Sequence, residues 1–174
     1  MTAVRITPAR RFPSLRRAVV AAGLALGIGL TAVPVQAAAA AAPVLTYTIA
    51  GATVTAPNWG AKVAVWTALG QRGDPYVWGG AGPSSFDCSG LTQYSWGKAG
   101  VYLPHSSRTQ STTGRWVSKA DLRAGDLVFF YSPVSHVALY VGNGYIVYAP
   151  TSGDVVRMAL LKYMSSYAGA RRPY

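Results

Sequence analysis

The 174-residue chain has one cysteine, two histidines and no glutamate, and its acidic side chains are five aspartates. A single cysteine excludes an internal disulfide, so Cys88 serves as a core thiol, an intermolecular link or a reactive group. No repeat of 20 to 50 residues occurs, which excludes solenoids and repeat arrays that bind cell walls. The length allows one domain with a hydrophobic core.

The first 37 residues have the layout of a secretory signal peptide. Five arginines come first, an apolar run from Ala18 to Val33 follows, and small residues surround Val35-Gln36-Ala37. The apolar run is shorter than the roughly 20 residues that a bilayer span needs, which favours cleavage near Ala37 over a retained membrane anchor. We therefore expect a secreted protein, outside the cell or associated with its wall.

After Ala37 the chain keeps eleven Lys and Arg against five Asp, a net charge of +6. This excess of positive charge favours contact with anionic wall polymers, although solubility alone also explains it. Apart from Arg171-Arg172 no basic run follows Arg17, so the pattern excludes a nucleic-acid partner. We expect a monomer.

Residues 38–58 carry no charge and are rich in Ala, Thr, Val and Pro, which predicts a flexible linker. Alternation in Leu45-Thr46-Tyr47-Thr48-Ile49 leaves open a single edge strand instead. The folded domain is predicted over 59–174.

Within this domain, helices are expected first and strands later. Apolar spacing predicts a helix over Ala61–Leu69, and a second from Ser89 to about Lys98 that Gly100 ends. Valine-rich and aromatic segments at 127–131, 136–141 and 145–149 predict strands. The order indicates an α+β fold with helices packed on a mainly antiparallel sheet.

Cys88 is predicted to lie at the N-terminus of the second helix, with Asp87 as its cap. Unsatisfied backbone N–H groups and the helix dipole lower a thiol pKa at such a place and favour the nucleophilic thiolate. The polar residues Asp87, Ser89 and Gly90 indicate an open turn, and a buried structural thiol is the competing interpretation.

A thiolate mechanism needs an imidazole to take the proton and return it to the leaving group. His136 begins a predicted strand on which Val137, Leu139 and Val141 face the core, so its own side chain faces away from it. His105 lies in a loop 17 residues after Cys88 and is the other candidate base. The strand position favours His136 as the base, and His105 is expected to line the groove.

The segment Gly142-Asn143-Gly144 predicts a hairpin. A two-residue loop pairs His136 with Thr151, whereas a three-residue loop pairs Val141 with Tyr145 and Ala138 with Tyr148. The second register is preferred because it gathers the apolar side chains on one face and places Tyr148 diagonally beside His136. Tyr148 is therefore the candidate third catalytic residue, and a strand aromatic without a catalytic part is the alternative.

Five motifs in order resemble those of the NlpC-type bacterial cell-wall cysteine peptidases, relatives of the papain-like fold, over about residues 61–160. They are Pro75-Tyr76-Val77-Trp78-Gly79-Gly80, Asp87-Cys88-Ser89-Gly90-Leu91, Gly125-Asp126-Leu127-Val128, His136-Val137-Ala138 and Ala149-Pro150-Thr151-Ser152-Gly153.

The resemblance implies hydrolysis, without a metal or other cofactor, of the bond between γ-linked D-glutamate and the diamino acid of peptidoglycan stem peptides. It implies Cys88 as nucleophile, His136 as base, and Tyr76 as a hydroxyl near the cysteine that helps the oxyanion site. Asp87 and Ser89 match positions that shape substrate binding. A packing role beside Trp78 is the alternative for Tyr76.

The sequence departs from the resemblance at Tyr148, where the family usually carries a histidine. A phenol can still form one hydrogen bond to the imidazole, but it is uncharged at neutral pH. Three functions therefore compete: an active endopeptidase, which is favoured, a weakened wall-binding or regulatory module, and a papain-like amidase or acyltransferase.

Overall fold

The structure, a computed structural model, describes residues 45–174. The predicted signal peptide and the first part of the predicted linker, residues 38–44, lie outside the described residues. Among the helices of the described part, none has the length and apolar character needed to cross a bilayer.

The described chain forms two main helices followed by a six-stranded antiparallel sheet, and a two-stranded hairpin precedes them. The sheet order is β3-β8-β4-β5-β6-β7. The bounds are β1 Thr46–Ile49, β2 Ala52–Thr55, α1 Trp59–Gly70, α2 Cys88–Lys98, α3 Ser107–Gln110, β3 Arg115–Trp116, β4 Leu127–Phe130, β5 His136–Gly142, β6 Tyr145–Tyr148, β7 Arg157–Leu160 and β8 Tyr167–Arg172. The predicted α+β fold is confirmed.

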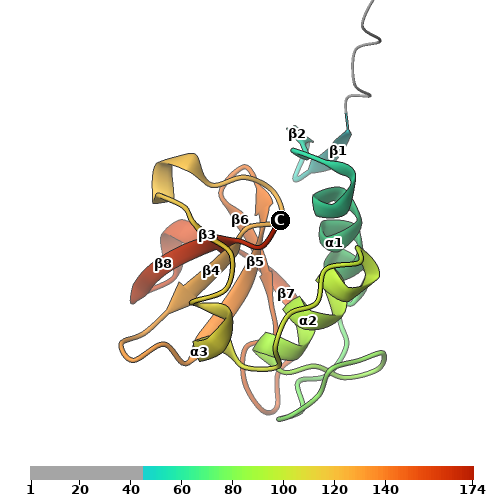
Figure 1. Ribbon diagram of the computed structural model, residues 1–174. Coiled ribbons are helices and arrows are strands. Elements are labelled where there is room, and N and C mark those ends of the chain that lie inside the picture. Colours follow the sequence, from blue (N-terminus) through green and yellow to red (C-terminus); the bar gives the residue numbers. More distant parts are fainter. Residues whose placement is uncertain (1–44) are drawn as a thin grey trace, which may run out of the picture. The chain divides into compact units, whose positions relative to one another are not determined.

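Both main helices begin where a side chain satisfies a free backbone N–H. The Asn58 carboxamide accepts from the Ala61 N–H, and the Asp87 carboxylate accepts from the Gly90 N–H. These caps explain why α1 starts two residues before its predicted start and α2 one residue before. Figure 1 shows both helices lying along the same side of the sheet.

Alternating residues of the central strands divide the core between the two faces of the sheet. Val137, Leu139 and Val141 of β5 pack into the larger core, which also contains the helices. Ala138 and Tyr148 belong to a smaller cluster on the opposite face. These two clusters confirm the predicted separation of the faces of β5. The separation arises because successive side chains of a strand point in opposite directions.

The β5–β6 hairpin reaches the predicted pairing by a different route. Its turn has two residues, Asn143 and Gly144, both with positive φ, and Gly142 pairs with Tyr145. An irregularity between Tyr140 and Gly142 then shifts the register, so that Leu139 pairs with Val147. The predicted three-residue loop and its Val141–Tyr145 pair are wrong, whereas the register of the hairpin body agrees with the prediction because a bulge absorbs the extra residue.

The prediction of a linker over 38–58 is wrong for its second part. Strands β1 and β2 form an antiparallel hairpin, and Tyr47, Ile49 and Val54 are buried in the larger core. The Tyr47 hydroxyl donates a hydrogen bond of 2.7 Å to the Val141 carbonyl oxygen at the end of β5. Burial of alternate side chains against another element supplies the order that the uncharged composition did not reveal.

Asp126, in one of the quoted motifs, has a structural place away from Cys88. Its carboxylate is fully buried and accepts two hydrogen bonds of 2.7 Å from the Arg172 guanidinium. This bidentate pair joins the start of β4 to the end of β8, two strands that already lie side by side.

Candidate active site

Cys88 is the first residue of α2, and a glycine-rich loop lies across that first turn. The Asp87 N–H donates to the Gly80 carbonyl oxygen at 2.8 Å. A Cβ atom on Gly90 would overlap that same oxygen, so only glycine allows the loop to approach the helix this closely. The motifs containing Tyr76 and Cys88 are thereby brought together although six residues, 81–86, separate them in the sequence.

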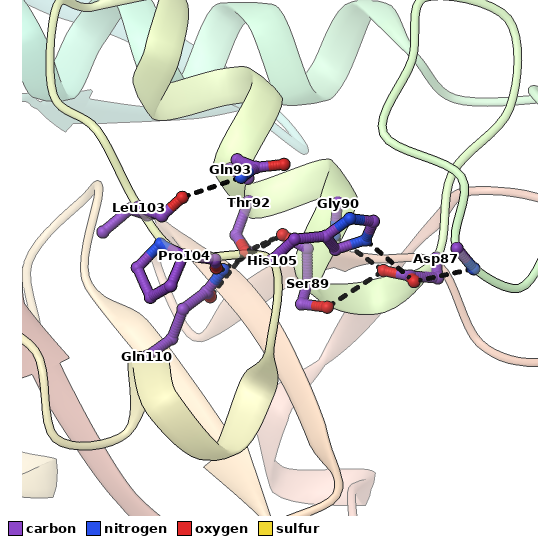
Figure 2. Close-up of polar contacts among 10 residues, drawn as sticks. Asp87, Ser89, Gly90, Thr92, Gln93, Leu103, Pro104, His105 and Gln110 are labelled. Carbon is purple, nitrogen blue, oxygen red and sulfur yellow. Dashed lines mark hydrogen bonds and ion pairs between the residues drawn. The ribbon is translucent and has the colours of Figure 1, made fainter.

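The Asp87 carboxylate lies at the centre of a hydrogen-bond network (Figure 2). One oxygen accepts from the Gly90 N–H at 2.7 Å and from the Ser89 hydroxyl at 3.0 Å. The other accepts from the Gly79 N–H at 3.0 Å and lies 2.9 Å from Nε2 of His105. His105 is thus tied to the residue that caps α2, with its side chain 29% exposed.

Gln110, at the end of α3, is fully buried and connects two segments on this side of the site by hydrogen bonds. Its amide nitrogen donates to the backbone oxygens of Ser89, at 3.0 Å, and Pro104, at 2.8 Å. Its amide oxygen accepts from the Thr92 hydroxyl at 2.7 Å. Figure 2 shows how these bonds join α2 to the loop that carries His105.

Two cavities meet at Cys88. The first, of about 270 Å³, is lined by Cys88, Asp87, Ser89 and His105 and is called here the Asp87 cavity. The second, of about 440 Å³, is lined by Cys88, Tyr76, His136 and Tyr148 and is called here the His136 cavity. Trp78 and Ser135 line both cavities.

Burial sets the protonation of the central pair. It raises the pKa of the Cys88 thiol above its ordinary value, although backbone N–H groups, that of Val137 first, act in the opposite direction. The expected lowering by the helix N-terminus is therefore outweighed by desolvation. Burial also lowers the pKa of His136 to about 4, against a smaller opposing effect of Asp87. At neutral pH the resting pair is a thiol and a neutral imidazole.

Tyr148 contacts the His136 ring edge to face, with ring centroids 5.8 Å apart and planes at 88°. Its hydroxyl accepts a hydrogen bond of 3.2 Å from Nε of Arg157, which lies directly opposite on β7. No hydrogen bond to the His136 ring is found among residues 45–174. Tyr148 therefore confines the His136 ring by contact, and the Tyr148 hydroxyl is directed to Arg157.

Tyr76 completes the surroundings of the thiol. Burial raises the pKa of Tyr76, and Cys88 and then Asp87 add to this effect. The phenol therefore stays protonated at neutral pH and remains a hydrogen-bond donor near the cysteine.

Each of the seven residues predicted for the site lines at least one of the two cavities, and Cys88 lines both. Asp87, Ser89 and His105 lie on one side of Cys88, and Tyr76, His136 and Tyr148 on the other. Sequence reasoning missed Gln110 and Arg157. Continuing the strand pairing beyond Gly153 would have placed Arg157 opposite Tyr148, whereas the one-turn helix that ends at Gln110 has no periodic signal. Within the described part of the chain, no group of three or more His, Cys, Asp or Glu side chains could hold a metal ion.

The antiparallel sheet packed against a helix that begins at Cys88 is the arrangement of papain-like α+β proteins. Residues 73–171 match the NlpC/P60 family, and the chain belongs to that family. The resemblance seen in the motifs is confirmed.

The relatives include proteins named as endopeptidases and peptidoglycan hydrolases. A probable endopeptidase of Mycobacterium tuberculosis is 44% identical over 108 residues, which are 62% of this chain and 28% of the relative. A probable endopeptidase of Corynebacterium glutamicum is 36% identical over 129 residues, covering 69% of this chain and 61% of the relative. The solved structure of the peptidoglycan hydrolase RipB from Mycobacterium tuberculosis has a TM-score of 0.60 at 31% identity, covering 66% of this chain and 64% of RipB.

The matched part of this chain thus spans 28% of the length of the Mycobacterium tuberculosis endopeptidase, and less than two thirds of the Corynebacterium glutamicum relative and of RipB.

Proposed function

We propose that the chain is a secreted peptidoglycan endopeptidase that hydrolyses the bond between γ-linked D-glutamate and the diamino acid of stem peptides, with Cys88 as nucleophile and His136 as base. The observation that carries this proposal is that Cys88, on α2, and His136, on β5, line the same cavity. Names of relatives such as "peptidoglycan hydrolase" support the substrate class.

In the first step, His136 takes the proton from the Cys88 thiol and the sulfur attacks the carbonyl carbon of the scissile bond. A neutral imidazole is required for this step, and the low pKa of His136 provides one at neutral pH. Proton transfer within the bound complex replaces a preformed thiolate, which the burial of Cys88 disfavours.

The attack places negative charge on the carbonyl oxygen. The Tyr76 hydroxyl is one donor for this charge, and the backbone N–H of Cys88 is another, because first-turn N–H groups have no acceptor within their helix. When the carbon–nitrogen bond breaks, protonated His136 gives its proton to the leaving amine. Water, deprotonated by His136, then hydrolyses the thioester and restores the thiol.

The test is digestion of purified peptidoglycan with mass analysis of the released muropeptides. Wild-type protein is expected to release new amino groups at the D-glutamyl bond, and Cys88→Ala is expected to release none while keeping the wild-type thermal midpoint. Release at the normal rate by Cys88→Ala would remove the proposal. Products cut at another bond would instead favour the amidase or acyltransferase alternative.

The hydrogen bond of the Tyr148 hydroxyl to Arg157 favours one second candidate, a wall-binding module with weakened catalysis. Sedimentation with insoluble walls separates the two functions. Binding without release of amino groups supports the second candidate, and release during sedimentation excludes it.

A further inference from the structure

The His136 cavity contains a positive charge that the proposed mechanism does not use. Among the described residues that line this cavity, Arg157 alone is a lysine or arginine. Its side chain is 51% exposed, so the guanidinium is open to a ligand. A substrate group that enters the cavity meets a cation within the same space as Cys88 and His136.

Arg157 is held in place from one side. Nε donates to the Tyr148 hydroxyl at 3.2 Å, and the guanidinium carbon lies 5.6 Å from the centroid of that ring. Nη2 lies 3.0 Å from a carboxylate oxygen of Asp154. Such contacts add little stability at a surface, but they reduce the number of conformations that the side chain must lose when it binds.

The guanidinium keeps donors for another acceptor. Nη1 has no hydrogen-bond partner within residues 45–174, and a guanidinium carries five N–H donors in a planar fork. A carboxylate matches the geometry of this fork and forms charge-assisted hydrogen bonds with it.

The position of His136 defines which part of a substrate meets Arg157. The imidazole must be within hydrogen-bond reach of the leaving nitrogen in order to protonate it. His136 lines the cavity with Arg157 and does not line the Asp87 cavity. The amino acid whose nitrogen leaves therefore occupies the His136 cavity; this step rests on the proposed function.

We propose that Arg157 binds a carboxylate of the amino acid on the leaving-group side and thereby selects substrates that carry one there. In stem peptides this favours a diamino acid with a free carboxylate on its side chain over one whose carboxylate is amidated or absent. The Tyr148 hydroxyl, held against Arg157, then serves mainly to orient the guanidinium.

The experiment uses two peptides that differ only in this group, a free carboxylate or a carboxamide on the leaving-side residue. For the wild type, kcat/KM is expected to be about 10- to 100-fold higher with the carboxylate, the range of a charge-assisted hydrogen bond. In Arg157→Gln the preference should fall to within about twofold through loss on the carboxylate peptide alone, since no charge remains to be paired.

One matched variant serves as the control. Arg115→Gln removes the same charge from β3, at the opposite edge of the sheet, and should keep the wild-type preference. Tyr148→Phe removes only the hydroxyl that orients the guanidinium and leaves the cation, so the preference should fall in part but not vanish. Thermal midpoints of all variants verify that they fold.

A wild type that cleaves both peptides equally well would overturn the inference while leaving the proposed function intact. Equal losses on both peptides in Arg157→Gln would also overturn it, because Arg157 would then act only by positioning Tyr148. If the wild type cleaves neither peptide, the proposed function fails, and titration of the same two peptides into Cys88→Ala decides the inference. Tighter binding of the carboxylate form that Arg157→Gln abolishes supports it, and equal binding overturns it.

Discussion

The two cavities that meet at Cys88 are built in different ways. On the Asp87 side, each carboxylate oxygen has two hydrogen-bonding partners, and Gln110 adds buried bonds beneath. On the His136 side, the imidazole is confined by burial and by ring contact with Tyr148. The helix that carries the thiol is thus positioned by directional bonds and the base by packing, which tolerates small rotations of the ring.

The largest expected difference concerns the two histidines. His136→Ala should lower kcat by at least about 10³-fold, because the proton acceptor is lost. His105→Ala should cost about tenfold or less and act mainly on KM, since it removes one of several partners of Asp87. Steady-state kinetics on one muropeptide measures both. If His105→Ala lowered kcat more than His136→Ala does, the assignment of the base to the His136 cavity would be wrong.

Stability should also differ between the two sides. Gln110→Ala leaves the backbone oxygens of Ser89 and Pro104 without this donor and is expected to destabilise the fold by about 3 to 4 kcal/mol. The control Gln93→Ala removes one partly buried bond, to the Leu103 carbonyl, and should cost about 1 kcal/mol. Urea unfolding gives both values. If the two substitutions lowered the free energy of unfolding equally, the burial of the Gln110 network would add nothing to stability.

A pH effect tests the desolvation of His136. Its folded pKa of about 4 lies below the unfolded value of about 6.5, so between these values the unfolded chain binds a proton that the folded chain does not. The stability from the neutral ring is complete above about pH 6.5 and is lost as pH falls toward 4. Between pH 7.5 and 4.5 this loss should be roughly 2 to 3 kcal/mol.

Urea midpoints of the wild type and His136→Gln at both pH values isolate this effect, because glutamine does not titrate. The wild type should lose more stability than the variant. Identical losses of stability in the wild type and in His136→Gln would mean that the His136 ring is hydrated in the folded protein.

The smallest effect is expected for Tyr148→Phe, which should change kcat by less than about threefold, because the hydroxyl is bonded to Arg157 and the ring contact is retained. The kinetic comparison also includes Tyr148→His, which offers a ring nitrogen to His136. A large loss in Tyr148→Phe would show that the phenol turns to the imidazole during the reaction.

Much of this arrangement could be predicted from the sequence. Local signals, the Asp cap before α2 and the valine alternation of β5, place Cys88 and His136 on the correct elements. Long-range effects could not be read in this way. The buried position of Gln110 depends on α2 and the 103–106 loop meeting above it, and the direction of the Cys88 pKa depends on how completely other elements cover the thiol.

The β1–β2 hairpin shows the same limit. The alternation in residues 45–49 allows an edge strand without requiring one. Contact with the end of β5 decides that Tyr47 and Val54 are buried. The bulge at the end of β5 likewise combines a two-residue turn with the register that the apolar faces require.

Contact of the β1–β2 hairpin with β5 also affects how the chain can be shortened. The family match begins at residue 73, yet Val54 packs so closely on Gly142 that a Cβ atom there would overlap it. A chain trimmed to the matched residues would lose α1 and would leave the end of β5, the strand that begins at His136, uncovered. For recombinant exchange between relatives, the unit to transplant therefore begins no later than Leu45.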